Sequence, residues 1–122
     1  MRKSILIVDD SESLRQVVNI ALTGAGYQII EAKDGVEGIE KLDGRKIHLI
    51  ISDVNMPNMN GIEFVKHVKN MERYKFTPII MLTTETQEYL MEESRKAGAK
   101  AWMVKPFKPD KMLEAVSKIL SI

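Results

Sequence analysis

Side chains that can do chemistry follow four apolar runs of this sequence, each at the point where the run ends. ILIV is followed by Asp9 and Asp10, IHLIIS by Asp53, TPIIML by Thr83 and AWMV by Lys105. If these runs are parallel strands, their carboxyl ends meet at one edge of a sheet, which is where such sheets bind ligands. We therefore expect three carboxylates, a hydroxyl and an ammonium group to share one pocket.

Three carboxylates that converge on one pocket favour a hard cation. Mg²⁺ prefers oxygen ligands, keeps several waters and commonly acts together with phosphate. An aspartate can also attack phosphorus and form an aspartyl phosphate, while a lysine and a hydroxyl supply the charge neutralisation and positioning that phosphoryl transfer needs. No Ser/His/Asp arrangement competes, because His48 and His67 fall in a strand pattern and a helix pattern without ligand spacing around them.

Each of these residues also has an ordinary structural explanation when it is taken alone. Asp10 or Ser11 can cap a helix, and an aspartate such as Asp53 is common in turns. The segment TETQ (84–87) has the pattern of a capping box, which explains its first threonine but not Thr83. These explanations treat the residues one at a time, whereas a shared site explains why they stand at successive strand ends.

The elements that must position these residues alternate along the chain. Each of five apolar runs is followed by a segment with helical spacing of apolar residues, and runs this apolar need cover on both faces. Parallel strands with helical, right-handed crossovers make a three-layer, doubly wound α/β fold. The run YQIIEA ends without a comparable polar cluster, so we place it at the edge of the sheet. We also expect Val17 and Val36 on buried helix faces, and a last helix that begins near Pro109.

The composition is typical of a single domain. The chain has 122 residues, of which 44% are hydrophobic, enough for a core of its own. Lys and Arg number 18 against 17 Asp and Glu, so the net charge of +1 gives no bulk attraction to nucleic acid or anionic membranes. The absence of cysteine excludes disulfides and Cys-based chemistry, and no apolar run has the length of a secretory or membrane segment. We expect one cytoplasmic domain over 1–122, a monomer with no nucleic-acid or membrane partner.

Taken together, the strand-end residues and their neighbours resemble the signature of response-regulator receiver domains. The matching positions are Asp9-Asp10, Asp53 followed by Met56-Pro57 and Gly61, Thr83, and Lys105-Pro106-Phe107. The resemblance covers the whole chain. It implies a flavodoxin-like, five-stranded parallel sheet in the order 2-1-3-4-5, the order also found in CheY.

The resemblance also implies a role for each residue of the site. Asp53 is the acceptor that becomes a 4-aspartylphosphate, and Thr83 and Lys105 contact the phosphoryl oxygens. The ligands of Mg²⁺ are Asp9, Asp10, Asp53 and the backbone carbonyl of Asn55. By the same resemblance the chain is not an enzyme beyond its own phosphorylation and dephosphorylation.

Further features of this family fall on other positions. The peptide bond between Lys105 and Pro106 is expected to be cis. Thr83 and Trp102 form the switch, with Trp102 at the position where the family usually has Tyr or Phe. Asn55 and Glu85 flank the water that hydrolyses the phosphorylated form.

The segments FTPIIMLTTE and GAKAWMVKPF are similar to those of stand-alone, chemotaxis-type, CheY-like members. This implies a sensor histidine kinase, of the CheA-like kind, as the phosphoryl donor. The surface of the fourth helix, fifth strand and fifth helix then binds a protein target, for which the flagellar switch is a candidate. A phosphorelay or phosphate-sink receiver is the alternative within the family.

Two other functions on a similar fold fit less well. A magnesium-dependent phosphatase with an aspartate nucleophile needs a second acid two residues later, where this chain has Asn55. A flavin-binding module needs a Ser-, Thr- or Gly-rich phosphate loop after the first strand, where Asp9, Asp10 and Glu12 would repel a phosphate.

Overall fold

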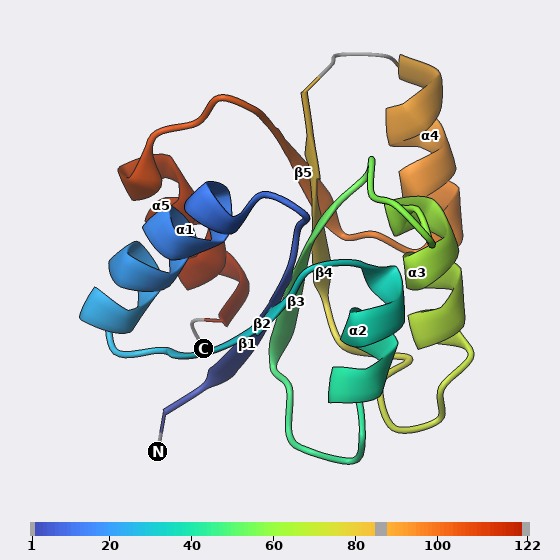
Figure 1. Ribbon diagram of the computed structural model, residues 1–122, viewed down its shortest axis with the longest axis horizontal. Coiled ribbons are helices and arrows are strands. Elements are labelled where there is room, and N and C mark those ends of the chain that lie inside the picture. The colour runs from blue at the N-terminus through green and yellow to red at the C-terminus, as the bar shows by residue number, and fades with distance from the viewer. Residues whose placement is uncertain (1, 85–87, 121–122) are drawn as a thin grey trace.

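Five strands and five helices alternate along the part of the chain that the structure describes (Figure 1). The computed structural model describes residues 2–84 and 88–120. The elements are β1 (Ser4–Val8), α1 (Glu12–Gly24), β2 (Gln28–Ala32), α2 (Gly35–Lys41), β3 (Leu49–Asp53), α3 (Gly61–Lys69), β4 (Ile79–Thr83), α4 (Glu88–Ala97), β5 (Ala101–Val104) and α5 (Pro109–Leu120). The predicted alternation is confirmed, including a last helix that begins at Pro109. Among the described residues, no helix is long and apolar enough to cross a membrane.

All strand pairs are parallel, and the sheet has the order β2-β1-β3-β4-β5. The prediction of a 2-1-3-4-5 sheet with YQIIEA at an edge is therefore confirmed. The register keeps the carboxyl ends of the strands level, since Val8 is opposite Ser52, Asp53 opposite Leu82, and Thr83 opposite Val104. The residues that follow these strands consequently emerge at one edge of the sheet.

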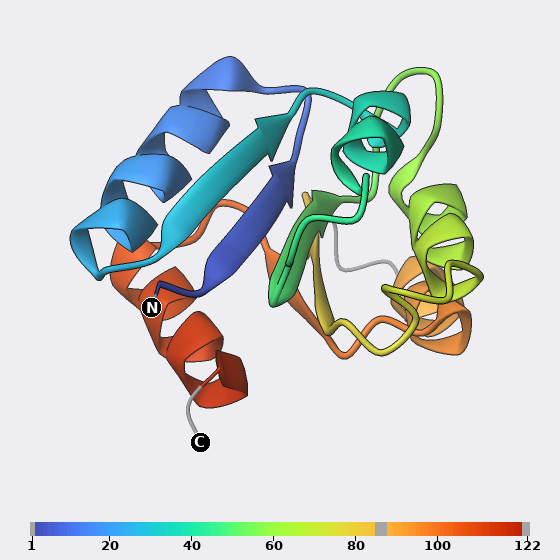
Figure 2. The same cartoon turned by 90° about the horizontal axis from the view of Figure 1, so that it is seen from below.

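The helices cover both faces of the sheet, with α1 and α5 on one face and α2, α3 and α4 on the other (Figures 1 and 2). Alternate strand residues point to the two faces, so Ile7 packs with Val18 and Val116, while Leu6 packs with Phe64. Every residue of β1, β3 and β4 is buried, whereas the edge strands β2 and β5 keep exposed or half-buried positions. The two apolar layers make a rigid frame for the strand ends.

Two residues predicted to be buried are not. Val17 is 47% exposed and Val36 is 44% exposed. In α1 the buried positions are Val18 and Leu22, which turns Val17 outward. The helix α2 packs through Gly35 and Gly38 instead: a Cβ on Gly38 would lie 2.8 Å from the ring of Phe64. Because the two glycines form the face of α2 that packs against the protein, Val36 lies on the face of α2 that is open to solvent.

Polar side chains define where the first three helices begin. Ser11 is the N-cap of α1 and its hydroxyl accepts from the Leu14 N–H at 3.2 Å. Of the two candidate caps, Asp10 and Ser11, Ser11 is therefore the N-cap of α1, and Asp10 is not. Asp34 caps α2 and Asn60 caps α3. The capping box predicted at 84–87 lies outside the described residues, as does Glu85.

Tyr74 links two loops at the amino-terminal edge of the sheet, and its loss should destabilise the fold. Its ring is 3% exposed, and its hydroxyl donates to the Arg45 carbonyl at 2.7 Å and accepts from the Gly44 N–H at 2.8 Å. Tyr74→Phe leaves both backbone groups without this partner, so we expect a loss of about 1–2 kcal/mol in the free energy of unfolding. Urea denaturation measures this loss. Tyr89→Phe is the matched control, because Tyr89 is 65% exposed and should change stability little; equal effects of the two substitutions would contradict the prediction.

Candidate functional site

Three carboxylates meet at the carboxyl edge of the sheet. Asp9 and Asp10 follow β1, Asp53 ends β3, and each offers an oxygen within 4.8 Å of the others. Asp9 is fully buried and Asp53 is 5% exposed, whereas Asp10 is exposed. The arrangement is a cluster of oxygen ligands with one side open to solvent.

Lys105 enters this cluster from the end of β5. Its Nζ lies 2.9 Å from Oδ2 of Asp9 and 3.2 Å from Oδ2 of Asp53. Its side chain is 15% exposed, so both ion pairs are largely shielded from water. One ammonium group therefore bridges the ends of the first and third strands.

The charges of the pocket shift the pKa values of its residues. Burial, and then the carboxylate of Asp9, raises the pKa of Asp53 although Lys105 acts in the opposite direction. Burial acts to lower the pKa of Lys105, but its contacts with Asp9 and Asp53 outweigh this and raise that pKa. The cluster brings three carboxylates to one ammonium group, so it holds more negative charge than Lys105 balances when all three are ionised. Oxygen ligands with excess negative charge suit a hard divalent cation, so the donor set fits Mg²⁺.

Asp9 is held at all of its hydrogen-bonding groups. Its N–H donates to the carbonyl of Ala32 at 3.1 Å, and its Oδ1 accepts from the Ser11 N–H at 2.8 Å. Its Oδ2 contacts Lys105, and its carbonyl accepts from Nη1 of Arg15 at 2.5 Å. Sequence reasoning missed Arg15. A cation so near the start of a helix is disfavoured by the helix dipole, and that is the signal that could have drawn attention to it.

The chain leaves Asp53 through a tight loop. The backbone N–H of Asn55 acts to lower the pKa of Asp53, against the net rise, and the Gly61 N–H donates to the Val54 carbonyl at 2.8 Å. Asn58, with φ of 69°, donates from Nδ2 to Oδ2 of Asp34 at 2.9 Å, which fastens the loop to the start of α2. The loop thus holds the main chain that follows the carboxylate.

Thr83 and Trp102 lie beside a small apolar cavity behind the pocket. Thr83 is 2% exposed and ends β4, and Trp102 is on the neighbouring edge strand and is 38% exposed. The cavity is too narrow for a water molecule and is lined by Val54, Met81, Thr83, Leu90, Met91, Ser94 and Trp102. Trp102 is thus a partly exposed residue that touches the space next to Thr83, in contrast to a fully buried core indole.

A shallow groove leads to Lys105 from the surface. It has a volume of about 510 Å³, and Leu14 and Phe107 give it apolar walls. Ser11 and Pro106 also line it, and the bond between Lys105 and Pro106 is cis. The groove therefore makes Lys105 accessible from the surface beside α1.

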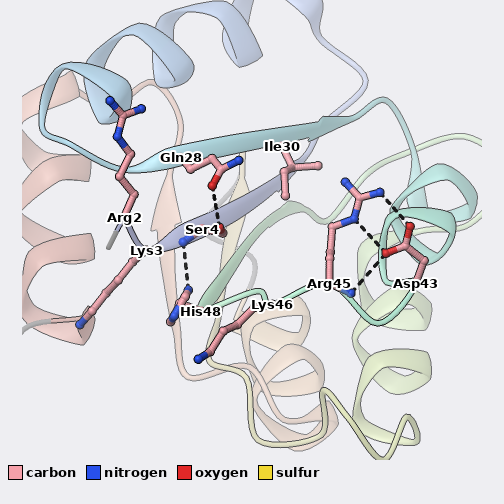
Figure 3. A pocket seen from close by; sticks show the side chains of 9 residues that line it. All are labelled: Arg2, Lys3, Ser4, Gln28, Ile30, Asp43, Arg45, Lys46 and His48. Carbon is pink, nitrogen blue, oxygen red and sulfur yellow. Dashed lines mark hydrogen bonds and ion pairs between the residues drawn. The ribbon is translucent and has the colours of Figure 1, made fainter.

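A larger cavity, of about 770 Å³, opens at the opposite edge of the sheet (Figure 3). Its carboxylate, Asp43, is held by Arg45 at 2.8 and 2.9 Å, and Nδ1 of His48 accepts from the Ser4 N–H at 2.9 Å. The cavity therefore has ample volume but no cluster of free oxygen ligands among its lining residues. The chemistry that the sequence predicts belongs to the smaller acid pocket.

Comparisons with known proteins agree with this geometry. The response regulator receiver domain family matches residues 5–117. Chemotaxis protein CheY1 of Helicobacter pylori is 41% identical over 118 residues, which are 95% of this chain and 95% of that protein. Chemotaxis protein CheY of Thermotoga maritima is 37% identical, with 98% of each chain covered. The solved structure of chemotaxis response regulator CheY4 of Vibrio cholerae has a TM-score of 0.93 and 47% identity over 98% of this chain and 100% of that one. This chain therefore belongs to the response regulator receiver domain family and is a CheY-like member of it.

Proposed function

We propose that Asp53 accepts a phosphoryl group from the phosphohistidine of a sensor histidine kinase. Mg²⁺ would be held by the carboxylates of Asp9, Asp10 and Asp53 and by the backbone carbonyl of Asn55. The observation that carries the proposal is the position of Lys105, whose ammonium lies 2.9 Å from Asp9 and 3.2 Å from Asp53. A buried acceptor, a second acid and a cation within reach of both supply positioning and charge stabilisation, which phosphoryl transfer needs.

The transfer step is a displacement at phosphorus. An oxygen of ionised Asp53 forms the new P–O bond, the P–N bond to the donor breaks, and its electron pair returns to the imidazole. Lys105 would turn its ammonium toward a phosphoryl oxygen, and the hydroxyl of Thr83 would donate to another. Bound Mg²⁺ supplies neutralisation of the negative charge on these oxygens. Beyond its own phosphorylation and dephosphorylation, the protein would catalyse nothing.

The CheY relatives support a role in chemotaxis-type signalling. We propose a CheA-like kinase as the donor and, as the output, a protein target such as the flagellar switch, bound by the surface of α4, β5 and α5. On that surface Tyr89 is 65% exposed and Trp102 is 38% exposed. Two aromatic side chains so open to solvent are suited to a protein contact.

The proposal is tested by phosphorylation from a small donor. Incubation with acetyl phosphate and Mg²⁺ should add one phosphoryl mass to the intact protein, and hydroxylamine should remove it, because an acyl phosphate is labile to this nucleophile. Omission of Mg²⁺ with a chelator should prevent the gain. A mass that does not change, in the presence of Mg²⁺ and excess donor, would reject the proposal.

Mg²⁺ should also stabilise the folded protein, through Asp10 among others. A ligand at 100 times its dissociation constant stabilises the state that binds it by about 2.7 kcal/mol. Asp10→Asn should reduce this gain and should raise the melting temperature without metal, because it removes one of three mutually repelling charges. Thermal melts with and without Mg²⁺ measure both effects. Glu40→Gln, which removes an exposed charge on α2, is the control; a lower metal-free melting temperature for Asp10→Asn would contradict the prediction.

Trp102 should report activation through its fluorescence. If phosphorylation draws Thr83 toward the phosphoryl group, the space behind Thr83 opens and the indole can enter it. Beryllofluoride with Mg²⁺, which mimics the phosphorylated state, should then shift the emission to the blue and reduce quenching by acrylamide. Thr83→Ala should abolish both changes, whereas Thr77→Ala, two residues before the start of β4, should not. Emission and quenching that are the same with and without beryllofluoride would place the output elsewhere.

A further inference from the structure

Arg15 connects the acid pocket to the edge of the sheet. Its Nη1 donates to the carbonyl of Asp9 at 2.5 Å, and its Nε donates to Oε1 of Glu31 at 2.9 Å. The other oxygen of Glu31 accepts from Nδ2 of Asn19 at 2.8 Å. One guanidinium therefore joins α1, the end of β1 and β2.

This ion pair differs from the surface ion pairs of the described residues. The side chain of Arg15 is 14% exposed and that of Glu31 is 36% exposed, and the two residues are 16 positions apart on different elements. The remaining pairs outside the acid pocket join residues two to four positions apart, at exposures of 38% or more, and are Asp43–Arg45, Glu72–Lys75, Glu92–Arg95 and Glu114–Lys118. Exposed ion pairs between residues so close in sequence contribute little to stability. A largely buried guanidinium that bonds both Glu31 and the Asp9 carbonyl can instead hold a backbone in place.

We propose that Arg15 is a positioning residue of the metal site, which holds the main chain of Asp9 so that its carboxylate faces Asp10 and Asp53. This inference rests on the proposed function. The carboxylate of Asp9 has two partners, the Ser11 N–H and Lys105. Lys105 divides its ammonium between Asp9 and Asp53, and in the proposed function it also serves a phosphoryl oxygen. Arg15 contacts the carbonyl of Asp9 and not its carboxylate, so its hold on Asp9 does not depend on where Lys105 points.

The sign of the effect on metal binding separates this role from a simple charge effect. If Arg15 acted only through its charge, it would repel a cation, and its removal would strengthen the binding of Mg²⁺. If Arg15 positions Asp9, its removal weakens binding, because partners that orient metal ligands typically change metal affinity by about 10- to 100-fold. A role only in folding would leave the affinity of the folded protein unchanged.

Titration calorimetry with Mg²⁺ at 25 °C tests the inference. Arg15→Met should bind Mg²⁺ about tenfold more weakly than the wild type, and Arg15→Lys, which keeps one donor for the Asp9 carbonyl, should recover part of the loss. Arg45→Met is the matched control, since Arg45 pairs with Asp43 outside the site, and its affinity should equal that of the wild type. Circular dichroism on the same samples verifies that each variant is folded.

Unchanged or tighter binding by Arg15→Met overturns the inference. If Arg15→Met does not fold, Glu31→Gln is measured in its place, because this variant keeps Arg15 but removes its ion-pair partner. Weaker Mg²⁺ binding by Glu31→Gln supports the inference, and unchanged or tighter Mg²⁺ binding overturns it. Mg²⁺ binding by the wild-type protein tests the proposed function, and the variants test the role of Arg15. If the wild-type protein does not bind Mg²⁺, the proposed function fails, whereas binding by the wild type with no effect of either variant rejects only the role of Arg15.

Discussion

Asp53→Asn is expected to abolish the phosphoryl mass that acetyl phosphate adds to the protein. An amide oxygen is a poor nucleophile toward phosphorus, while the side chain keeps its size in a site that is 5% exposed. Intact-protein mass spectrometry measures the loss, which should be complete. Asp43→Asn, an exposed aspartate outside the acid pocket, should label like the wild type. Stoichiometric labelling of Asp53→Asn would mean that the acceptor is another residue.

The same variant should be more stable than the wild type when metal is absent. Burial and Asp9 raise the pKa of Asp53 above its ordinary value of 3.8, so the folded state disfavours the ionised form. This carboxylate therefore lowers stability as the pH rises through its folded-state pKa. Asp53→Asn should raise the melting temperature at pH values above the folded-state pKa, and the gain should shrink as the pH falls toward 3.8. A lower melting temperature at all pH values would indicate that the contact with Lys105 dominates.

Gly61→Ala is expected to destabilise the protein strongly, although it adds only one methyl group. A Cβ at this position would lie 2.1 Å from the carbonyl oxygen of Asp53 and 2.8 Å from the Cα of Val54. Both are backbone atoms beside the acceptor, so a rotamer change cannot relieve the clash. We expect a loss of about 3 kcal/mol or more in the free energy of unfolding, at the upper end of overpacking effects, and slower labelling of Asp53 in the protein that remains folded.

Urea denaturation and the rate of labelling measure the two effects of Gly61→Ala. Gly24→Ala is the matched control, because a Cβ on Gly24 meets no atom within 4 Å. In a helix, alanine is favoured over glycine by up to about 1 kcal/mol, so Gly24→Ala should leave stability equal or slightly higher. If Gly61→Ala is as stable as Gly24→Ala, the loop after Asp53 can move without cost, and the close approach does not constrain the acceptor.

The sequence by itself was enough to predict the alternation of strands and helices and the doubly wound sheet. Uniformly apolar runs such as ILIV can be satisfied only by cover on both faces, which requires a parallel sheet between two helical layers. The meeting of Asp9, Asp53, Thr83 and Lys105 at one edge was also predictable. It follows from the direction of parallel strands, and no side-chain detail is needed for it.

Positions that depend on packing were less predictable. Val17 and Val36 have helical spacing that suits a buried face, yet both lie outside. Periodicity cannot reveal that α2 approaches its neighbours through Gly35 and Gly38, because that depends on the loop after Asp53 and on Phe64. The apolar run AWMV likewise suits a buried strand, yet it forms the edge strand β5, whose residues are all exposed or half-buried.

Only the tertiary structure decided how the charges of the site are arranged. The sequence placed Lys105 near the acids, but its simultaneous contact with Asp9 and Asp53 depends on the distance between the ends of β1, β3 and β5. The contact between Arg15 and the Asp9 carbonyl likewise requires α1 to lie against β2 with Glu31 as an anchor. Electrostatic interactions depend on distance and burial, and these quantities arise when segments far apart in the chain come together. The residue types therefore defined which chemistry is available, and the packing of the elements decided which oxygens and cations meet.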